Sequence, residues 1–279
     1  MIVYNAYIKY LAFAAITVSL PIIALIILKI IQKLSAGKVK SLVCLVGKTA
    51  IVTGGCSGIG FETALVLASR GCRVILADRS DGARAKKKII EITHNTNIET
   101  KHLDLASLQS VRKFANDING TEERLDILIN NATVGAAGSK HTDDGLNAAM
   151  QINHFGPFLL THLLTDLLKK SAPSLTSNSL HPGLVYGDLP LADKHMISFN
   201  TLINLARVIV LMIYGKSEEE GAQTTIHLAL SNKVKNITGK HFWDCRMFPP
   251  PPGAWNSKFC DAIWKKSEEL VHLKPEEKL

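Results

Sequence analysis

The residues of this chain that are best suited to chemistry lie in the stretch TGGCSGIG, from Thr53 to Gly60. Glycines at Gly54, Gly58 and Gly60 let the backbone turn sharply and come close to a pyrophosphate group. A helix that begins at such a turn offers its first amides and the positive end of its dipole to the phosphate charge. The spacing therefore predicts a phosphate-binding turn, provided that the flanking elements are the right ones.

The flanking sequence supplies those elements. Thr49–Thr53 is a short apolar run typical of a buried strand, and residues 73–77 form a second one. Gly71, just before the second run, stands where a helix would end. Between the two runs, apolar residues recur at helical spacing, at Phe61, Ala64, Leu65 and Ala68. The pattern predicts a strand, a helix and a second, parallel strand.

The choice of dinucleotide depends on the end of that second strand. A carboxylate such as Asp78 accepts hydrogen bonds from both ribose hydroxyls and repels a 2′-phosphate, so it favours NAD. Arg79 follows it directly and could pair with that phosphate, which leaves NADP open. We expect NAD, because one flexible arginine offsets the repulsion in a partly dry pocket only incompletely.

Further motifs accompany the glycine turn. They are HLDLASLQSVRKF, LDILINNA, DDGLNAAMQINHFGPFLLTHLL, NSLHPGLV and EEEGAQTTIHLALS. Together with the turn they resemble the short-chain dehydrogenases/reductases, and the last three look like the retinol dehydrogenase branch. The resemblance implies a doubly wound α/β fold with a Rossmann-type parallel sheet. It also implies a membrane-tethered enzyme that interconverts lipophilic, retinoid-like alcohols and carbonyls with a nicotinamide cofactor.

The resemblance implies roles for individual residues. Around the pyrophosphate it places Thr53, Gly54, Ser57, Gly58, Ile59 and Gly60. It assigns the adenine pocket to Asp104 and Leu105, the inner edge of the nucleotide to Asn130 and Ala132, the turn at the nicotinamide to Pro182 and Gly183, and the support of a proton relay to Asn153. Without the surrounding motifs, capping of strand ends is the favoured interpretation of Asp104 and Asn130.

The proton-transfer group that this family uses is missing from the sequence. Hydride transfer at a carbonyl carbon needs a group that moves a proton at the oxygen. In the family a tyrosine does this, helped by a lysine four residues later and by a serine from the preceding strand. Beyond Asn153 the chain has only Tyr186 and Tyr214, and the residues four places after them are a proline and a glutamate. We therefore expect no turnover from the chain as written.

The missing segment would lie between Ser174 and Leu175, and this point is called the join below. The stretch LTHLLTDLLKKSAPS reads as the end of a long helix, and TSNSLHPG reads as a short strand that leads into a loop. A strand, its crossover helix and the next strand need about 30 residues or more. We expect a sheet shortened by one strand and one helix. Residues 176–180 should then pair directly with residues 126–130, because a parallel strand lands beside the one it left.

Three functional hypotheses remain open at this stage. By resemblance the chain is an NAD(P)-dependent oxidoreductase. Its missing segment favours a nucleotide-binding pseudoenzyme or a product with no stable fold, and the clean gap looks like a skipped exon, which would make the chain an exon-skipped isoform, or a gene-model error. Nucleic-acid binding is not expected. The formal charge of +8 is concentrated in residues 1–48, which hold six lysines and no acidic residue, so the remainder is nearly neutral.

The amino-terminal stretch LAFAAITVSLPIIALIIL, residues 11–28, is uncharged and would be about 27 Å long as a helix. More lysines follow it than precede it, which favours a single-pass anchor with the remainder in the cytoplasm. The family resemblance implies that the membrane is that of the endoplasmic reticulum. A secretory signal peptide has a shorter apolar core of about 7 to 15 residues. We expect an anchor and basic linker in residues 1–40 and an NAD(P)-binding domain in residues 41–279.

Three further predictions concern a substrate lid, the cysteines and the glycosylation sequons. Residues 188–216, which are strongly apolar around residues 202–214, are expected to form a lid over a lipophilic substrate or a helix that contacts the membrane. Five cysteines without a C-x-x-C pair predict neither a disulfide framework nor a metal site. The glycosylation sequons at Asn119, Asn131 and Asn236 are interpreted as chance matches, since a cytoplasmic domain does not meet the glycosylation machinery.

Overall fold

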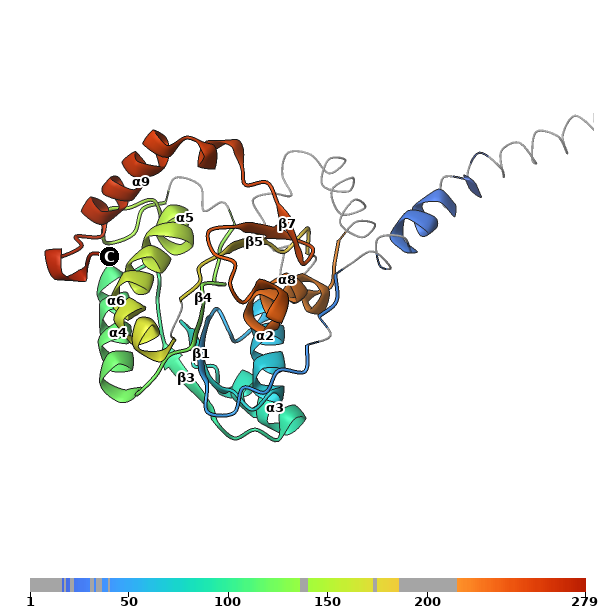
Figure 1. The fold of residues 1–279 in the computed structure, drawn as a ribbon, viewed down its shortest axis with the longest axis horizontal. Helices are drawn as coiled ribbons and strands as arrows, with labels where there is room; N and C mark the ends of the chain where they lie inside the picture. The colour runs from blue at the N-terminus through green and yellow to red at the C-terminus, as the bar shows by residue number, and fades with distance from the viewer. Residues whose placement is uncertain are drawn as a thin grey trace, which may run out of the picture.

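The computed structural model describes residues 17, 19–20, 23–30, 33, 37–39, 41–135, 140–172, 175–185 and 215–279. The described residues between 17 and 33 are helical, and residues 23–30 project away from the body of the molecule (Figure 1). Most of the predicted anchor and nearly all of the predicted lid lie outside the described residues. Within the described part of the chain, no helix is long and apolar enough to cross a membrane.

The amino-terminal half is built on a four-stranded parallel sheet with the strand order β3-β2-β1-β4. Its strands are β1 (Thr49–Thr53), β2 (Arg73–Asp78), β3 (Ile98–His102) and β4 (Ile127–Ile129). Every residue of the central strand β1 is buried, as expected for a parallel sheet covered on both faces. The predicted strand-helix-strand unit and the Rossmann-type α/β fold are therefore confirmed.

Helices cover both faces of this sheet. Alternate residues of β1 point to opposite faces, so Ala50 and Val52 belong to one core cluster and Ile51 to the other. The first cluster is closed by α2 (Gly58–Ser69), α3 (Ala83–Thr93) and α8 (Glu218–Leu230). The second is closed by α4 (Leu108–Thr121) and α6 (Gly156–Ser171). The carboxyl ends of the strands are thus held between two helical layers.

An irregular helical turn directly precedes α6. After the short helix α5 (Ala148–Met150), residues Gln151–Phe155 form a π-helical turn before α6 begins at Gly156. A Cβ on Gly156 would lie 2.9 Å from the carbonyl oxygen of Leu105, so a glycine is needed for this close approach. Turns of the π type occur frequently at functional sites.

The strand after the join does not pair with β4, so the predicted pairing of residues 176–180 with residues 126–130 is wrong. Instead β5 (Ser179–His181) pairs in parallel with β6 (His241–Trp243), which pairs with β7 (Arg246–Phe248) in a separate three-stranded sheet. Side chains reinforce this choice. Asn178 donates to the Ile237 carbonyl at 2.7 Å and accepts from the Lys240 amide at 3.0 Å. Strand β5 therefore pairs with the carboxy-terminal strand β6 and not with β4.

This arrangement leaves the outer edge of β4 without a strand partner among the described residues. The three residues of β4 are only half-buried, so water reaches part of this edge. Hydration offsets a cost of about 1 to 3 kcal/mol that each unpaired and fully buried backbone group would otherwise carry. The fold thus tolerates the gap, although an open edge is a weak point of any sheet.

The carboxy-terminal residues fold back over α4 and α6 (Figure 1). Helix α9 (Ser257–Leu270) is followed by a tail that Arg112 of α4 holds. Arg112 forms an ion pair with Glu277 at 2.5 Å and donates to the carbonyls of Val271 and His272 at 3.3 and 2.9 Å. Short 3-10 turns occupy Asn232–Val234, Pro252–Trp255 and Pro275–Glu277.

Candidate functional site

The glycine turn has the geometry that its sequence predicts. Gly54 and Gly58 have φ angles of +63° and +55°, in the left-handed region that favours glycine. A Cβ on Gly60 would lie 2.2 Å from the carbonyl oxygen of Gly54, closer than any side chain can approach. The three glycines are therefore required by the backbone path, which brings the start of α2 tightly against the end of β1.

The first turn of α2 is open for an anion. Ser57 occupies the N-cap position with an extended backbone, and among the described residues no side chain caps the helix there. No acidic residue stands in the first turn, so its amides and dipole are not neutralised from within the helix. Ile59, the second residue of the helix, faces α8, where a Cβ on Gly221 would lie 3.3 Å from it.

A residue that the sequence analysis did not assign braces this turn. The Asn131 side chain donates to the Thr53 carbonyl at 2.9 Å, and the backbone amides of Asn131 and Ala132 both donate to the Thr53 hydroxyl at 3.0 Å. Thr53 is fully buried. These bonds fasten the end of β4 to the end of β1, directly beneath Gly54. The second asparagine of the motif LDILINNA is the sequence feature that could have indicated this role.

Asp78 ends β2 on the same edge of the sheet. Its carboxylate accepts hydrogen bonds from the backbone amide and the hydroxyl of Ser80, both at 3.0 Å, while Arg79 is exposed. Burial raises the pKa of the neighbouring Cys56 thiol to about 11, and the negative charge of Asp78 adds to the rise. Cys56 therefore stays a neutral thiol beside this carboxylate, although it lies within the glycine turn.

The side chains predicted for the adenine pocket and for the inner edge of the nucleotide contact other parts of the protein. Asp104 accepts from the Ala106 amide at 2.9 Å, and Asn130 donates to the Thr161 hydroxyl at 3.0 Å. Leu105 is buried. The contact of Asp104 is that of a residue that caps a strand end, whereas Asn130 contacts helix α6; the role of both residues toward a nucleotide stays a prediction.

Asn153 lies on the π-helical turn and holds the segment that follows β4. Its Oδ1 accepts from the Val134 amide at 2.9 Å and from the Thr133 hydroxyl at 3.1 Å, and its Nδ2 donates to the Val134 carbonyl at 2.9 Å. The side chain thus forms a two-way clamp on Val134. This clamp orients the chain at the edge where Gly54 and Ala132 meet.

The turn after β5 contains Pro182 and Gly183. Gly183 has a φ of +90°, and a Cβ at this position would lie 3.1 Å from the Lys216 ammonium nitrogen. Lys216 is buried and forms an ion pair with Asp244. The tyrosine next to this turn, Tyr186, lies outside the described residues.

The family model for short chain dehydrogenases matches residues 48–174, so the match stops at the join where the sequence analysis located a loss. Retinol dehydrogenase 11 of Mus musculus is 33% identical over 312 residues, which cover 91% of this chain and 96% of that protein. The chain belongs to the short-chain dehydrogenase/reductase family. A second relative, retinol dehydrogenase 13 of Homo sapiens, is 34% identical over 81% of this chain and 85% of that protein. Within the family the chain is therefore retinol dehydrogenase-like.

The relatives of this short-chain dehydrogenase-like chain contain residues that it lacks. The alignment with the mouse protein is 312 residues long, longer than the 279-residue chain itself. Among solved structures, L-sorbose reductase from Gluconobacter frateurii, complexed with NADPH and L-sorbose, has a TM-score of 0.60 and 18% identity. The likeness covers 75% of this chain and 99% of that one, and at such low identity it shows the shared fold.

Carboxylates gather near the open end of α2 in this family member. The Glu218 Oε1 atom, at the start of α8, lies 3.7 Å from the position that a Cβ on Gly58 would take. Burial raises the pKa of the Glu62 carboxyl above its ordinary value, and Glu219 and Glu218 add to the rise. A bound phosphate group would therefore meet the helix amides on one side and the Glu218 carboxylate on another.

Proposed function

We propose that this chain is a nucleotide-binding member of the short-chain dehydrogenase/reductase family that holds a nicotinamide dinucleotide without turning it over. The observation that carries the proposal is the open first turn of α2, braced by the Thr53–Asn131 bonds and placed beside Asp78. Amides and a helix dipole bind the pyrophosphate charge. A carboxylate at the end of β2 binds the ribose hydroxyls.

The bound dinucleotide would accept a hydride from an alcohol, or in its reduced form donate one to a carbonyl, and the chain would have to move a proton at the substrate oxygen. The sequence has no tyrosine followed by a lysine four residues later. Lys216 does not replace that lysine, because its ammonium group is buried in an ion pair with Asp244. A substrate oxygen would therefore have no proton donor of suitable pKa among the described residues of the site, and binding would occur without chemistry.

NAD is the proposed dinucleotide, with NADP as the second choice. Asp78 ends β2, where a carboxylate binds the ribose hydroxyls in dinucleotide-binding folds, and repulsion between its charge and a 2′-phosphate would weaken NADP binding. Arg79 is exposed and carries a positive charge, so it reduces the difference in affinity between NAD and NADP without reversing it. Differential scanning fluorimetry with each dinucleotide compares the two affinities directly.

Membrane attachment through residues 1–40 is part of the proposal. Apolar side chains on the projecting helical residues are left in the open, among them Leu20, Ile23, Ile26 and Ile27, each at least half exposed. Apolar surface of this kind is stabilised by lipid. The lysines after residue 28 favour a cytoplasmic domain, and the similarity to retinol dehydrogenases supports an endoplasmic reticulum location. Release of the intact chain by carbonate extraction of membranes would exclude the anchor.

The second candidate is an active dehydrogenase of retinol or another lipophilic alcohol. The similarity to retinol dehydrogenases favours it. A turnover assay with retinol and NAD or NADP separates the two candidates, since only the second requires product to form. Sequencing the transcript across the codons for Ser174 and Leu175 tests separately whether the chain is an exon-skipped isoform.

A further inference from the structure

The small carboxy-terminal sheet of β5, β6 and β7 packs against α8 on one face only. Residues paired across neighbouring strands point to the same face, and successive residues of a strand alternate between the faces. One face carries Phe242, which is buried and lies 6.3 Å from the His227 ring of α8. The opposite face, called the outer face below, carries Ser179, His181, His241, Trp243, Arg246 and Phe248.

The outer face has aromatic side chains at its centre. The Trp243 ring stacks on the His181 ring at 4.6 Å and contacts the Phe248 ring at 5.3 Å. Trp243 and Phe248 nevertheless remain 38 and 51% exposed, and Met247, on the other side of strand β7, is 60% exposed. Three large apolar side chains are thus open to solvent around one short hairpin, and exposed apolar surface of this kind marks an interaction site.

The amino-terminal linker touches this hairpin and so indicates what covers it. Gly37 packs against the turn between β6 and β7, where a Cβ on Gly37 would lie 2.7 Å from both the Asp244 carbonyl oxygen and the Cys245 sulfur. Two residues later the Val39 amide donates to the Gln223 side chain of α8 at 3.0 Å. The linker is therefore fastened to α8 and to the hairpin turn.

The segment before this linker is the one proposed to enter the membrane. Residues 23–30 carry exposed apolar side chains and project away from the body (Figure 1). The uncharged run ends at Leu28, nine residues before Gly37, so at most about 32 Å of fully extended chain lies between them. A membrane that holds the run thus has its surface within reach of the hairpin.

The charges around the hairpin suit an anionic lipid surface. Asp244 is the one acidic residue of the sequence between positions 231 and 260, and it forms an ion pair with the buried Lys216. The same stretch contains five basic residues, Lys233, Lys235, Lys240, Arg246 and Lys258. Arg246 is exposed and pairs directly with Trp243 across the hairpin. Aromatic rings beside basic side chains are typical of protein surfaces at the membrane–water interface.

We propose that the outer face of the carboxy-terminal sheet lies on the membrane and forms a second, interfacial contact with lipid. The Trp243 and Phe248 rings enter the boundary between head groups and acyl chains, and Arg246 pairs with lipid phosphate. The inference rests on the membrane attachment through residues 1–40 that is part of the proposed function. It adds the surface by which the folded domain touches the bilayer.

Tryptophan fluorescence of the full-length chain in lipid vesicles tests this contact. The vesicles contain phosphatidylcholine and phosphatidylserine, either with bromine on the acyl chains close to the head groups or without bromine. Bromine quenches a tryptophan only when the two come into close contact. The chain has three tryptophans, so the double variant Trp255→Phe/Trp264→Phe leaves Trp243 alone. Its emission should be lower in the brominated vesicles than in the unbrominated ones.

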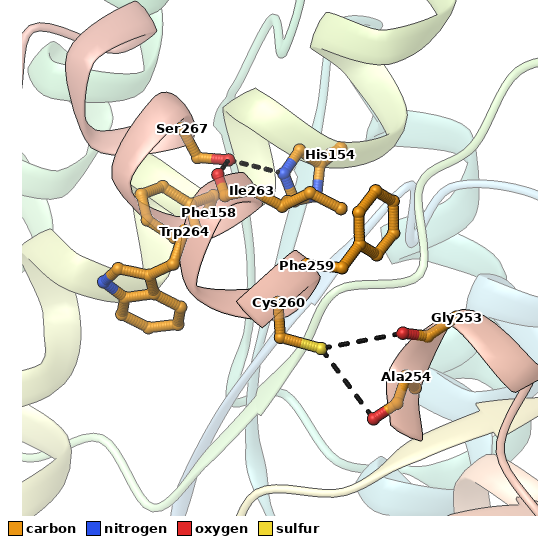
Figure 2. A pocket seen from close by; sticks show the side chains of 9 residues that line it. All are labelled: His154, Phe158, Gly253, Ala254, Phe259, Cys260, Ile263, Trp264 and Ser267. Atoms are coloured by element: carbon orange, nitrogen blue, oxygen red, sulfur yellow. Dashed lines mark hydrogen bonds between the residues drawn. The ribbon is translucent and has the colours of Figure 1, made fainter. Parts of the chain in front are cut away.

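The matched control is a second double variant, which keeps Trp264 of α9 and has phenylalanine at the other two positions. Trp264 is 45% exposed, so its exposure is close to that of Trp243. Its ring meets the Phe158 ring edge to face at 5.0 Å, and Ser267 of the same helix contacts His154 at 2.8 Å (Figure 2). Helix α9 lies on the opposite side of the body from residues 23–30 (Figure 1). The emission of Trp264 should therefore be the same with and without bromine.

A charge placed in the outer face provides a further comparison. Phe248→Glu, in the chain that keeps only Trp243, should remove most of the quenching, because a carboxylate is costly to bury in lipid. Ile92→Glu, at an exposed position of α3, should leave the quenching unchanged. Equal quenching of Trp243 and Trp264 would overturn the proposal, and so would quenching of Trp243 that Phe248→Glu does not reduce.

Carbonate extraction of the same vesicles separates this contact from the anchor. Protein that stays in the vesicles after extraction, but whose Trp243 is not quenched, would overturn the contact and leave the anchor standing. Protein that carbonate releases, but whose Trp243 is quenched before extraction, would overturn the anchor and support the contact. A chain that does not associate with the vesicles at all would contradict both.

Discussion

Asn131 and Thr53 are joined by two hydrogen bonds, one from the Asn131 side chain to the Thr53 carbonyl at 2.9 Å and one from the Asn131 amide to the Thr53 hydroxyl at 3.0 Å. Thr53 is the last residue of β1 and is followed by the glycine turn. The pair therefore fixes the end of β4 relative to the glycine turn.

The first prediction concerns this pair. Asn131→Ala removes the bond to the Thr53 carbonyl and should lower the free energy of unfolding by about 1 to 2 kcal/mol, measured by urea denaturation. The dissociation constant for NAD should rise as well, because the glycine turn loses its brace. Asn119→Ala is the matched control, since exposed Asn119 also makes one side-chain bond to a carbonyl. Equal effects of the two substitutions would contradict the role assigned to Asn131.

The second prediction concerns the carboxylate beside the turn. Glu218→Gln removes a negative charge close to Gly58 and should tighten dinucleotide binding by about two- to five-fold at low ionic strength. The gain should shrink as salt is added, because the charges are partly exposed to solvent. Titration calorimetry at two salt concentrations measures both effects. Glu276→Gln, in an exposed 3-10 turn far along the chain, serves as the control.

The third prediction concerns the choice of dinucleotide. Asp78→Ala removes both the acceptor for the ribose hydroxyls and the charge that repels a 2′-phosphate, so the preference for NAD over NADP should disappear. Asp143→Ala, at an exposed position outside the site, should keep the preference of the parent. The ratio of the two dissociation constants is the measurement. A parent chain that binds NADP as tightly as NAD would show that Asp78 does not set the selectivity.

The fourth prediction concerns stability in mild acid. Burial lowers the pKa of His162, which is only 6% exposed and whose Nε2 lacks a partner among the described residues. The unfolded chain, with a histidine pKa of about 6.5, then takes up the proton more readily than the folded chain. Stability is therefore full above about pH 6.5 and falls as the pH drops from there toward the lowered folded value.

Substitution of His162 tests that pH dependence. Asn at this position keeps a donor for the contact with the Glu277 carbonyl but does not titrate. His162→Asn should thus flatten the fall in unfolding free energy between about pH 6.5 and 5, measured by denaturation at a series of pH values. His94→Asn is the control, because His94 is exposed and its left-handed backbone suits asparagine. If the unfolding free energy of His162→Asn falls with pH as steeply as that of the parent, His162 does not cause the loss of stability in acid.

The sequence allowed the β1-α2-β2 unit and the glycine turn to be predicted, because these depend on local periodicity and on backbone conformations that glycine favours. It did not allow the partner of β5 to be predicted. Both β4 and β6 offer the same backbone groups, and the choice is reinforced by the Asn178 contacts with residues about 60 positions later. The role of Asn131 was also missed, since an asparagine after a strand fits capping, glycosylation and bracing equally well. The His154–Ser267 contact joins residues 113 positions apart, and no local pattern marks it.

The central claim is that the chain binds a dinucleotide but does not catalyse hydride transfer, and one paired measurement on the full-length protein tests it most directly. NAD is added at about 100 times its dissociation constant, which should stabilise the folded state by about 2.7 kcal/mol in thermal denaturation. The same sample is then supplied with retinol, and formation of NADH is followed by absorbance. The account predicts thermal stabilisation together with no NADH above that of a protein-free control. Formation of NADH at a rate that depends on protein concentration, or the absence of any stabilisation by NAD or NADP, would contradict it.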